Sequence, residues 1–354
     1  MTSRNSLSSP RRTWMLGALV ATTLVAAAGC APEPTSAPTP TPSSSHESTR
    51  EPQAATDLAP LRGIRAASGT FDHASIAAKI DNAPPARPQI GLEKTDLVFE
   101  ELVEGGLTRY VAVWQSDIPA LLGPVRSIRP MDPDIISPFG GIVAYSGGQE
   151  RFVALMQKAP VYNAVHGQGD TAATFFRSTD KPAPHNVLVK AQELLAEHTD
   201  LAKPATQFSF ASTVPASSAV AAGTPTATIT YRFSPQVSGS WTYDALRAVF
   251  LRSQAGAPDI DADGAQLTAT NVIVLRVPVT ISQDIPKTEM IGSGEGWVST
   301  GGATLHATWS KGSATDPITL VDDAGVVIKL AAGNSWIELV PTAGSVEFAP
   351  PAAG

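Results

Sequence analysis

The fold class is decided by residues 96–115, which read Asp96-Leu-Val-Phe-Glu-Glu-Leu-Val-Glu104, then Gly105-Gly106, then Leu107-Thr-Arg-Tyr-Val-Ala-Val-Trp-Gln115. Both halves of this stretch are rich in β-branched, apolar and aromatic residues, and a glycine pair between two such runs is typical of a hairpin turn. We therefore expect a hairpin of two strands at residues 96–104 and 108–115.

The segments around this hairpin alternate between strand and helix patterns. Prolines at positions 84, 85 and 88 end a short strand that leads into Asp81-Asn82. Apolar periodicity and turn residues predict further elements at 141–145 (strand), 149–158 (helix), 186–189 (strand) and 190–198 (helix). Such alternation favours a mixed α/β sheet.

The second half of the chain has a different pattern, in which short strand-like runs are separated by Gly, Pro, Asp and Asn. The runs lie at residues 226–233, 271–277, 296–299, 303–310, 318–321, 326–330 and 336–340. A stretch rich in Ala, Ser, Thr and Pro precedes them. The sequence therefore predicts an α+β protein: a mixed α/β N-terminal domain (64–203), a linker (204–225) and a smaller β-rich C-terminal domain (226–347).

The N-terminus has the pattern of a lipoprotein signal. Arginines at positions 4, 11 and 12 precede the apolar run Trp14–Gly29, which is shorter than the roughly 20 residues of a membrane-spanning helix. The small residues Ala27-Ala28-Gly29 lead directly to Cys30, the single cysteine of the chain. We expect a signal peptide at 1–29 and a lipid on Cys30; the alternative is a secreted protein with an incidental cysteine. The export route, general secretory or twin-arginine, stays open.

Residues 30–63 are rich in Pro, Ser and Thr and are predicted to form a disordered tether. The signal carries three arginines and no acid, so its removal changes the net charge from −7 to −10. This charge argues against nucleic acid as a partner. With Cys30 acylated, no thiol remains for disulfides or metal ligation. The expected location is extracytoplasmic, with the membrane contacted through the lipid.

Motifs along the body of the chain resemble those of the bacterial YerB-like lipoproteins. In the first half these are Lys79–Asn82, Glu104–Arg109, Gly123–Arg129 and Pro184–Asn186; in the second half they are Asn271–Val274, Gly292–Gly294, Thr308–Lys311 and Gly333–Ile337. The resemblance covers about residues 70–342. It implies paired N- and C-terminal domains and no mechanism, because the function of that family is unknown.

The segment Gly123–Arg129 carries the main candidate site. Its Gly-Pro turn delivers Arg126, Ser127 and Arg129 close together, and guanidinium groups suit the recognition of phosphate or carboxylate. Further candidates for anion binding are Arg109, Arg177, His185 and Asn186. The alternative is that nearby carboxylates pair with these arginines and merely hold loops on the sheet.

Other chemistry has weaker support in the sequence. Asp81, Asn82 and Glu100 are candidates for acid–base or metal support, while His185 is either a base or a hydrogen-bonded structural residue. The acidic run at 259–264 begins like a calcium loop but has Thr270 where the bidentate glutamate belongs, which favours a polar turn. No cofactor or metal is predicted; a divalent metal has no sequence support.

Three hypotheses follow for function. The preferred one is an envelope lipoprotein whose N-terminal domain binds an anionic ligand or a cell-wall component. The second is an enzyme, by phosphotransfer or hydrolysis, that acts on a phosphorylated envelope precursor. The third is a scaffold that only binds other proteins. The sequence leaves catalysis, the ligand, the partners and the oligomeric state open.

Overall fold

The structure is a computed structural model that describes residues 55–352. The predicted signal peptide, Cys30 and most of the predicted tether lie outside the described residues. Strand β1 (Thr56–Leu58) pairs with β2 (Arg65–Ala67), and Leu61 between them is fully buried. The folded part of the chain therefore includes residues 56–63, which the sequence analysis assigns to the tether.

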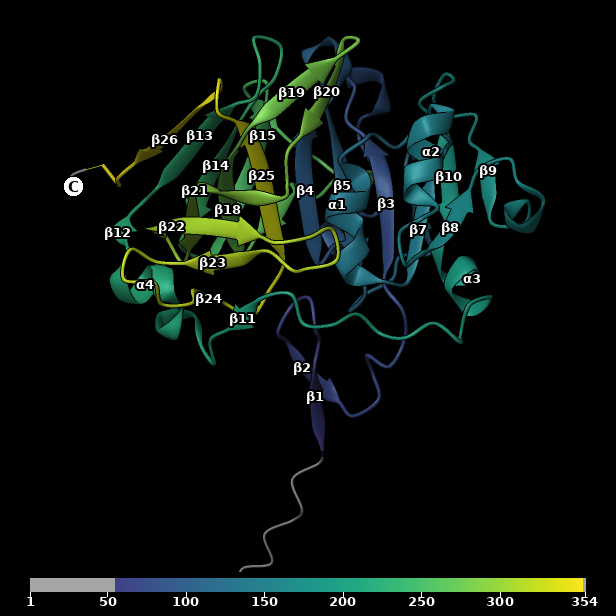
Figure 1. Cartoon of the computed structure of the whole chain (residues 1–354). Coiled ribbons are helices and arrows are strands. Elements are labelled where there is room, and N and C mark those ends of the chain that lie inside the picture. The colour runs from purple at the N-terminus through teal and green to yellow at the C-terminus, as the bar shows by residue number, and fades with distance from the viewer. Residues whose placement is uncertain (1–54, 353–354) are drawn as a thin grey trace, which may run out of the picture. The chain divides into compact units, whose positions relative to one another are not determined.

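An eleven-stranded mixed sheet forms the centre of the molecule (Figure 1). Its order is β12 (Thr224–Pro225), β22 (Ala303–Lys311), β21 (Gly292–Thr300), β18 (Asn271–Val277), β25 (Ser335–Pro341), β4 (Leu97–Leu102), β5 (Thr108–Trp114), β3 (Ile76–Asp81), β7 (Ile142–Tyr145) and β8 (Tyr162–Val165), with β23 (Thr319–Val321) beside β22. Strands β25 and β4 pair in parallel, from Ser335–Leu97 to Glu338–Glu100. The sheet thus continues from the second half of the chain into the first without a break.

A six-stranded antiparallel sheet packs on one face of the central sheet. Its strands are β16 (Ala257–Pro258), β15 (Val249–Gln254), β14 (Ser238–Asp244), β13 (Thr228–Arg232) and β26 (Ser345–Ala349), with β17 (Thr268–Ala269) beside β15. The inward residues of both sheets, among them Trp241, Phe250, Val272 and Trp336, form one hydrophobic core. Trp336 contacts Tyr110 and Trp241 edge-on, with ring centroids 5.4 and 5.3 Å apart. Such pairs fix the relative position of the two sheets.

Helices cover the opposite face of the central sheet. These are α1 (Asp132–Ile136), with the short helix η4 (Ser137–Phe139) after it, and α2 (Glu150–Met156). Their apolar residues pack with Phe99 and Val111 in a second core that includes Ile337 from the other half of the chain. Helices α3 (Ala191–Ala196) and α4 (Ser218–Ala222) lie at the two sides of the molecule (Figure 1).

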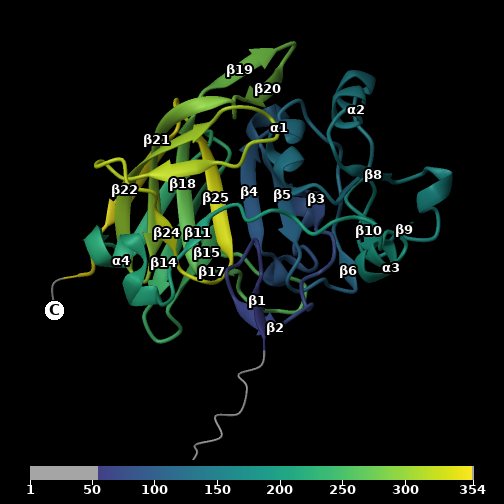
Figure 2. The same cartoon turned by 60° about the horizontal axis from the view of Figure 1, so that its bottom comes forward.

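Smaller elements complete the fold. They are the sheet of β6 (Leu121–Leu122), β10 (Val187–Lys190) and β9 (Phe175–Arg177), the pair β11 (Ser209–Phe210) and β24 (Lys329–Leu330), the hairpin β19 (Val279–Ser282) and β20 (Ile285–Thr288), and the short helices η1 (Pro84–Ala86), η2 (Leu92–Lys94), η3 (Glu104–Gly106), η5 (Gly169–Thr171) and η6 (Val214–Ala216). In Figure 2, β1 and β2 lie in front of the end of the sheet where β4 begins. Gly333 donates to Arg62 at 2.8 Å and holds this segment there.

The predicted α+β class is confirmed. Strands β4 and β5 form the expected hairpin, and Gly105 and Gly106 have φ values of +69° and +70°, which glycine adopts without steric cost. The sequence analysis did not identify β14, β15 or β26. The boundary between two sequence domains stays a prediction, while in the structure both halves share one sheet and both cores.

Candidate functional site

Three arginines gather where β3 ends and β5 begins. Asp81 on β3 lies opposite Arg109 on β5, and side chains two residues apart in a strand share a face. Lys79, Asp81 and Arg109 are therefore all on the face of the sheet that the helices cover. Arg126 and Arg129 reach the same place from the loop that follows β6. We call Asp81, Arg109, Arg126, Arg129 and His185 the arginine cluster.

The loop 123–129 is held on the sheet by backbone hydrogen bonds. Val125 N donates to the Val187 carbonyl at 2.8 Å, and Arg126 N donates to the Lys79 carbonyl at 2.8 Å. Gly123 has a φ of +145°, and a Cβ there would lie 2.8 Å from Leu188 Cδ2. Glycine therefore permits the close approach that places Arg126 and Ser127 beside β3.

Two of the arginines have carboxylate partners. Arg126 Nε lies 3.2 Å from Asp81 Oδ2, and His185 Nδ1 lies 2.6 Å from the same oxygen. Arg129 Nε donates to Glu104 Oε2 at 2.7 Å. Burial raises the pKa of Glu104, but the hydrogen bond from Arg129, a backbone hydrogen bond and the positive charges of Arg129 and Arg109 together lower the net pKa.

Arg109 differs from the other two arginines. Its Nη1 donates to the Ser127 carbonyl at 2.7 Å, and no carboxylate of the described residues lies within 4 Å of it. Its exposed fraction is 8%. Burial, and next the positive charges of Arg129 and Arg126, lower its pKa to about 10. The negative charges of Asp81 and Glu104 raise the pKa again. Arg109 is thus a largely buried cation whose compensating carboxylates lie beyond ion-pair distance, and an anion that contacts it directly would stabilise it.

Lys79 lies beneath the arginine cluster and is fully buried. Its ammonium contacts Glu101 and lies 2.7 Å from Asp132 Oδ1 on α1. Burial lowers the pKa of Lys79 to about 8, with Asp132 raising it and Arg109 lowering it further. This group fixes α1 to the sheet under the cluster.

The other predicted residues of this region hold the loop that carries His185. Arg177 Nη1 donates to Asn186 Oδ1 at 2.8 Å, and Asn186 Nδ2 donates to the Ser178 carbonyl at 2.8 Å. These contacts close the loop between β9 and β10 and place His185 against Asp81. Neither Arg177 nor Asn186 makes a hydrogen bond to the arginines of the cluster in the described part of the chain.

Asn82 and Glu100 point to the opposite face of the sheet, into the core under the six-stranded sheet. Glu100 accepts from Thr108 at 2.6 Å and from Arg252 at 2.5 Å, and Arg252 also contacts Asp259. Arg252 is fully buried among the rings of Tyr110, Trp241 and Trp336. Arg252 is not among the residues predicted from the sequence, because an arginine inside an apolar run gives no sign that a distant glutamate neutralises its charge.

The acidic run at 259–264 forms a turn, as expected, in which Gly264 N donates to the Asp261 carbonyl at 2.9 Å. Its first two aspartates are nevertheless buried, with exposed fractions of 4% for Asp259 and 2% for Asp261. No group of three or more His, Cys, Asp or Glu side chains within residues 55–352 is arranged to hold a metal ion.

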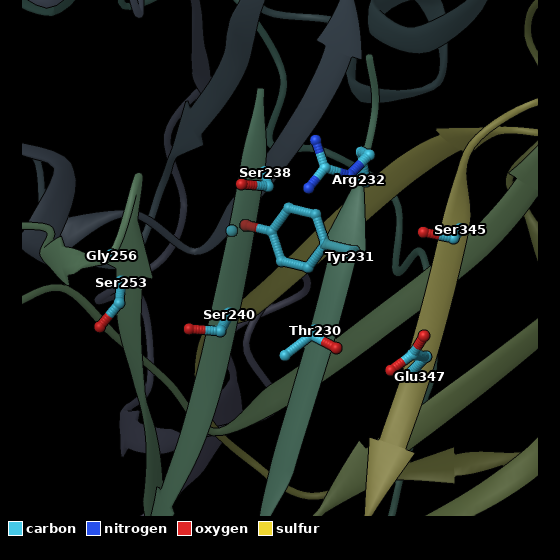
Figure 3. Close-up of a pocket in the computed structure, with 10 residues that line it drawn as sticks. Thr230, Tyr231, Arg232, Ser238, Ser240, Ser253, Gly256, Ser345 and Glu347 are labelled. Atoms are coloured by element: carbon cyan, nitrogen blue, oxygen red, sulfur yellow. The ribbon is translucent and has the colours of Figure 1, made fainter. Parts of the chain in front are cut away.

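A cavity of about 360 Å³ lies away from the arginine cluster, on the outer face of the six-stranded sheet (Figure 3). Figure 3 shows side chains of β13, β14, β15 and β26 around it, and most of them carry short hydroxyls. Its charged side chains are Arg232 and Glu347. This hollow results from small side chains on an open sheet.

Comparison with known proteins places the chain among proteins of unknown function. The N-terminal domain described as "Protein of unknown function (DUF3048)" matches residues 61–204, and the C-terminal domain of the same description matches residues 229–337. A Bacillus subtilis (strain 168) protein described as "Putative lipoprotein YerB" is 25% identical over 296 residues, which are 80% of this chain and 86% of that protein.

The crystal structure of the YerB protein from Bacillus subtilis has the same fold, with a TM-score of 0.71 at 22% identity over 82% of this chain and 99% of that one. Within residues 55–352, no helix has both the length and the apolar composition that a membrane crossing requires. The two domain matches and the shared fold confirm the resemblance seen in the sequence: the chain belongs to the DUF3048 family, with both its N- and C-terminal domains.

Proposed function

We propose that this protein is an extracytoplasmic lipoprotein, anchored through Cys30, whose arginine cluster binds an anionic ligand of the cell envelope. The observation that supports this proposal is the gathering of three guanidinium groups at one place, of which Arg109 has no carboxylate within 4 Å among the described residues. An anion with several oxygens, such as a phosphate or pyrophosphate group, can accept from several of these donors at once.

The position of the cluster suits a tethered protein. The folded body begins at the end of the sheet where β4 starts, since Arg62 lies 3.7 Å from Asp96. The arginine cluster lies at the other end, where β3 finishes and β5 begins. The first described residues and the arginine cluster therefore lie at opposite ends of the central sheet.

Binding is tested with residues 30–354 carrying Cys30→Ser, so that no acyl chain is present. Isothermal titration with inorganic pyrophosphate at low salt is expected to give one saturable site. Arg109→Gln is expected to weaken it at least tenfold, which corresponds to about 1.4 kcal/mol. The matched control is Arg232→Gln, because Arg232 is an exposed arginine on β13, on the outer face of the six-stranded sheet.

Two results would contradict the proposal: no saturable binding of pyrophosphate or of a lipid pyrophosphate, or equal effects of Arg109→Gln and Arg232→Gln. The first result would leave an interaction scaffold as the remaining hypothesis. Affinity that falls steeply with added salt supports an electrostatic site.

One observation favours the enzyme as a second candidate. Asp81 Oδ2 lies 2.6 Å from His185 Nδ1, an arrangement that orients the ring and leaves Nε2 free to move a proton at a bound phosphate ester. Incubation with a lipid pyrophosphate and a divalent metal tests it by the release of inorganic phosphate. Release that His185→Gln abolishes, while pyrophosphate binding is retained, supports catalysis; no release leaves binding alone.

A further inference from the structure

A second cleft lies where the loop after β3 meets the turn after β15. Its volume is about 400 Å³, and it is lined by Arg87, Pro88, Gln254, Ala257, Pro258, Asp259 and Ile260. We call it the Arg87 cleft. Pockets of this size accommodate small molecules. One wall comes from residues 87–88 and the other from residues 254–260, so both halves of the chain are needed to form it.

Hydrogen bonds from backbone and side-chain groups fix the two walls against each other. Asp261 Oδ2 accepts from Gly91 N at 3.0 Å, and Ala262 N donates to the Gln89 carbonyl at 2.8 Å. Lys181 adds a contact to the Ala86 carbonyl at 2.6 Å. The cleft is thus formed before any ligand arrives, which reduces the entropic cost of binding.

Arg87 supplies a positive charge to the cleft. Its Nε donates to Asn82 Oδ1 at 3.2 Å and its Nη2 to the Asn82 carbonyl at 2.8 Å. With its oxygen turned towards Arg87, the Gln254 amide accepts from Nη2 at 2.6 Å. All these partners are neutral, and no carboxylate within residues 55–352 lies within 4 Å of Arg87. Its position is fixed while its charge remains unpaired.

Asp259 supplies a negative charge to the same cleft. Its Oδ2 contacts Arg252, but Arg252 also binds Glu100, so two carboxylates share one guanidinium. In the described residues no hydrogen bond involves Asp259 Oδ1. The cleft therefore combines an unpaired cation with a partly compensated anion, and the apolar side chains of Pro88, Pro258 and Ile260 also line it.

We infer that the Arg87 cleft binds a zwitterionic α-amino compound with an apolar side chain, as a free amino acid or a short peptide. The carboxylate binds Arg87, whose fork of N–H donors matches it, and the ammonium binds Asp259. The side chain packs on Pro88, Pro258 and Ile260, where Ile260 is 42% exposed in the structure. This inference is independent of the arginine cluster.

The inference is tested with the mature chain carrying Cys30→Ser, titrated with L-leucine, D-leucine, leucinamide, N-acetyl-leucine and the dipeptide Ala-Ala by calorimetry. At least one of the leucines and the dipeptide is expected to bind. Comparison of their affinities shows whether the cleft prefers a free amino acid or a peptide. Loss of the carboxylate in leucinamide, or of the ammonium in N-acetyl-leucine, is expected to weaken binding at least tenfold.

Arg87→Gln adds a selective readout. This variant is expected to lower the affinity for leucine at least tenfold. The affinity for leucinamide is expected to stay the same, because leucinamide has no carboxylate for Arg87 to bind. Ala257→Trp is expected to block all ligands by filling the cleft without removing a charge, and Arg232→Gln is the matched control. The inference is overturned when no zwitterion binds saturably, when N-acetyl-leucine binds as well as leucine, or when Arg87→Gln weakens leucine and leucinamide equally.

Discussion

Glu100 on β4 and Arg252 on β15 form a fully buried ion pair, with 2.5 Å between Oε2 and Nη2. The pair joins the two halves of the chain across the core between the sheets. Three aromatic rings surround the guanidinium, and the nearest ring centroid, that of Trp336, lies 4.7 Å from Cζ. Hydrogen bonds and ring contacts together replace the water that Arg252 loses.

Glu100→Gln is expected to lower the free energy of unfolding by about 1.5–3 kcal/mol, because the buried Arg252 loses a charged hydrogen-bond partner and keeps Asp259. The measurement is urea denaturation followed by tryptophan fluorescence. Lys94→Gln is the control: Lys94 pairs with Asp117 at 3.2 Å on the surface, and its loss is expected to cost less than about 1 kcal/mol. Equal costs for both variants would show that the buried pair has no special role.

The parts of the fold that could be predicted are those with local signals. The hairpin 96–115 was identified because the glycine pair and the two apolar runs lie within twenty residues. Strand β15 was not predicted, because Arg252 interrupts its apolar pattern. The charge of Arg252 is compensated by Glu100, which is 152 residues away in the sequence and therefore gives no local signal. The parallel pairing of β25 with β4 has no local signal for the same reason.

The candidate site was predictable to a similar extent. Adjacency in the sequence indicated that Arg126, Ser127 and Arg129 lie together, and the structure brings the further candidate Arg109 to them through its contact with the Ser127 carbonyl. Which groups pair with which carboxylate could not be predicted, since the partners are far apart in the sequence; Asp81 and His185, for example, are separated by 104 residues. Alternation along β4 places Glu100 on the other face, in the core, away from the cluster.

Asp261 gives the protein a pH-dependent stability. Burial, together with a hydrogen bond to Glu93, raises its pKa from 3.8 to about 9. Between about pH 4 and pH 9 the folded state keeps a proton that the unfolded state has lost, so the free energy of unfolding falls as pH rises through this window. Asp261→Asn cannot ionise and is expected to reduce this fall between pH 5 and pH 8 by up to about 4 kcal/mol, since each pH unit in the window contributes about 1.4 kcal/mol.

The measurement is the urea midpoint at several pH values. Asp263→Asn is the control on the same turn, because Asp263 is exposed and accepts only the local hydrogen bond from Ala265. This control is expected to keep the pH dependence of the urea midpoint that the native protein shows. A native slope in Asp261→Asn would mean that Asp261 is ionised in the folded state at neutral pH.

Cys30→Ser is expected to move the protein from the membrane fraction to the soluble fraction. The physical reason is that stable anchoring requires two or more acyl chains, which a serine at this position does not receive. Incorporation of labelled palmitate and fractionation of cells measure the effect, with Ala31→Ser as the neighbouring control. Retention of Cys30→Ser in the membrane fraction would show that another segment provides the attachment.

Gly123→Ala tests whether the loop 123–129 positions the arginine cluster. The new Cβ would lie 2.8 Å from Leu188 Cδ2 and 2.9 Å from the Val187 carbonyl oxygen. That oxygen accepts the hydrogen bond from Val125, so it cannot withdraw without releasing the loop. We expect the free energy of unfolding to fall by about 1–3 kcal/mol, as measured by urea denaturation.

The same variant is expected to bind pyrophosphate at least tenfold more weakly at a temperature where it is fully folded, because Arg126 and Ser127 move away from Asp81 and Arg109. Gly325→Ala is the control, since Gly325 has a φ of +77° and a Cβ added there would meet no heavy atom of the described residues within 4 Å. It is expected to cost about 1 kcal/mol of stability and to leave affinity unchanged. If Gly123→Ala lowers the stability but leaves the affinity for pyrophosphate unchanged, the loop 123–129 is not part of the binding site, because a displaced Arg126 cannot contact the same anion as Arg109.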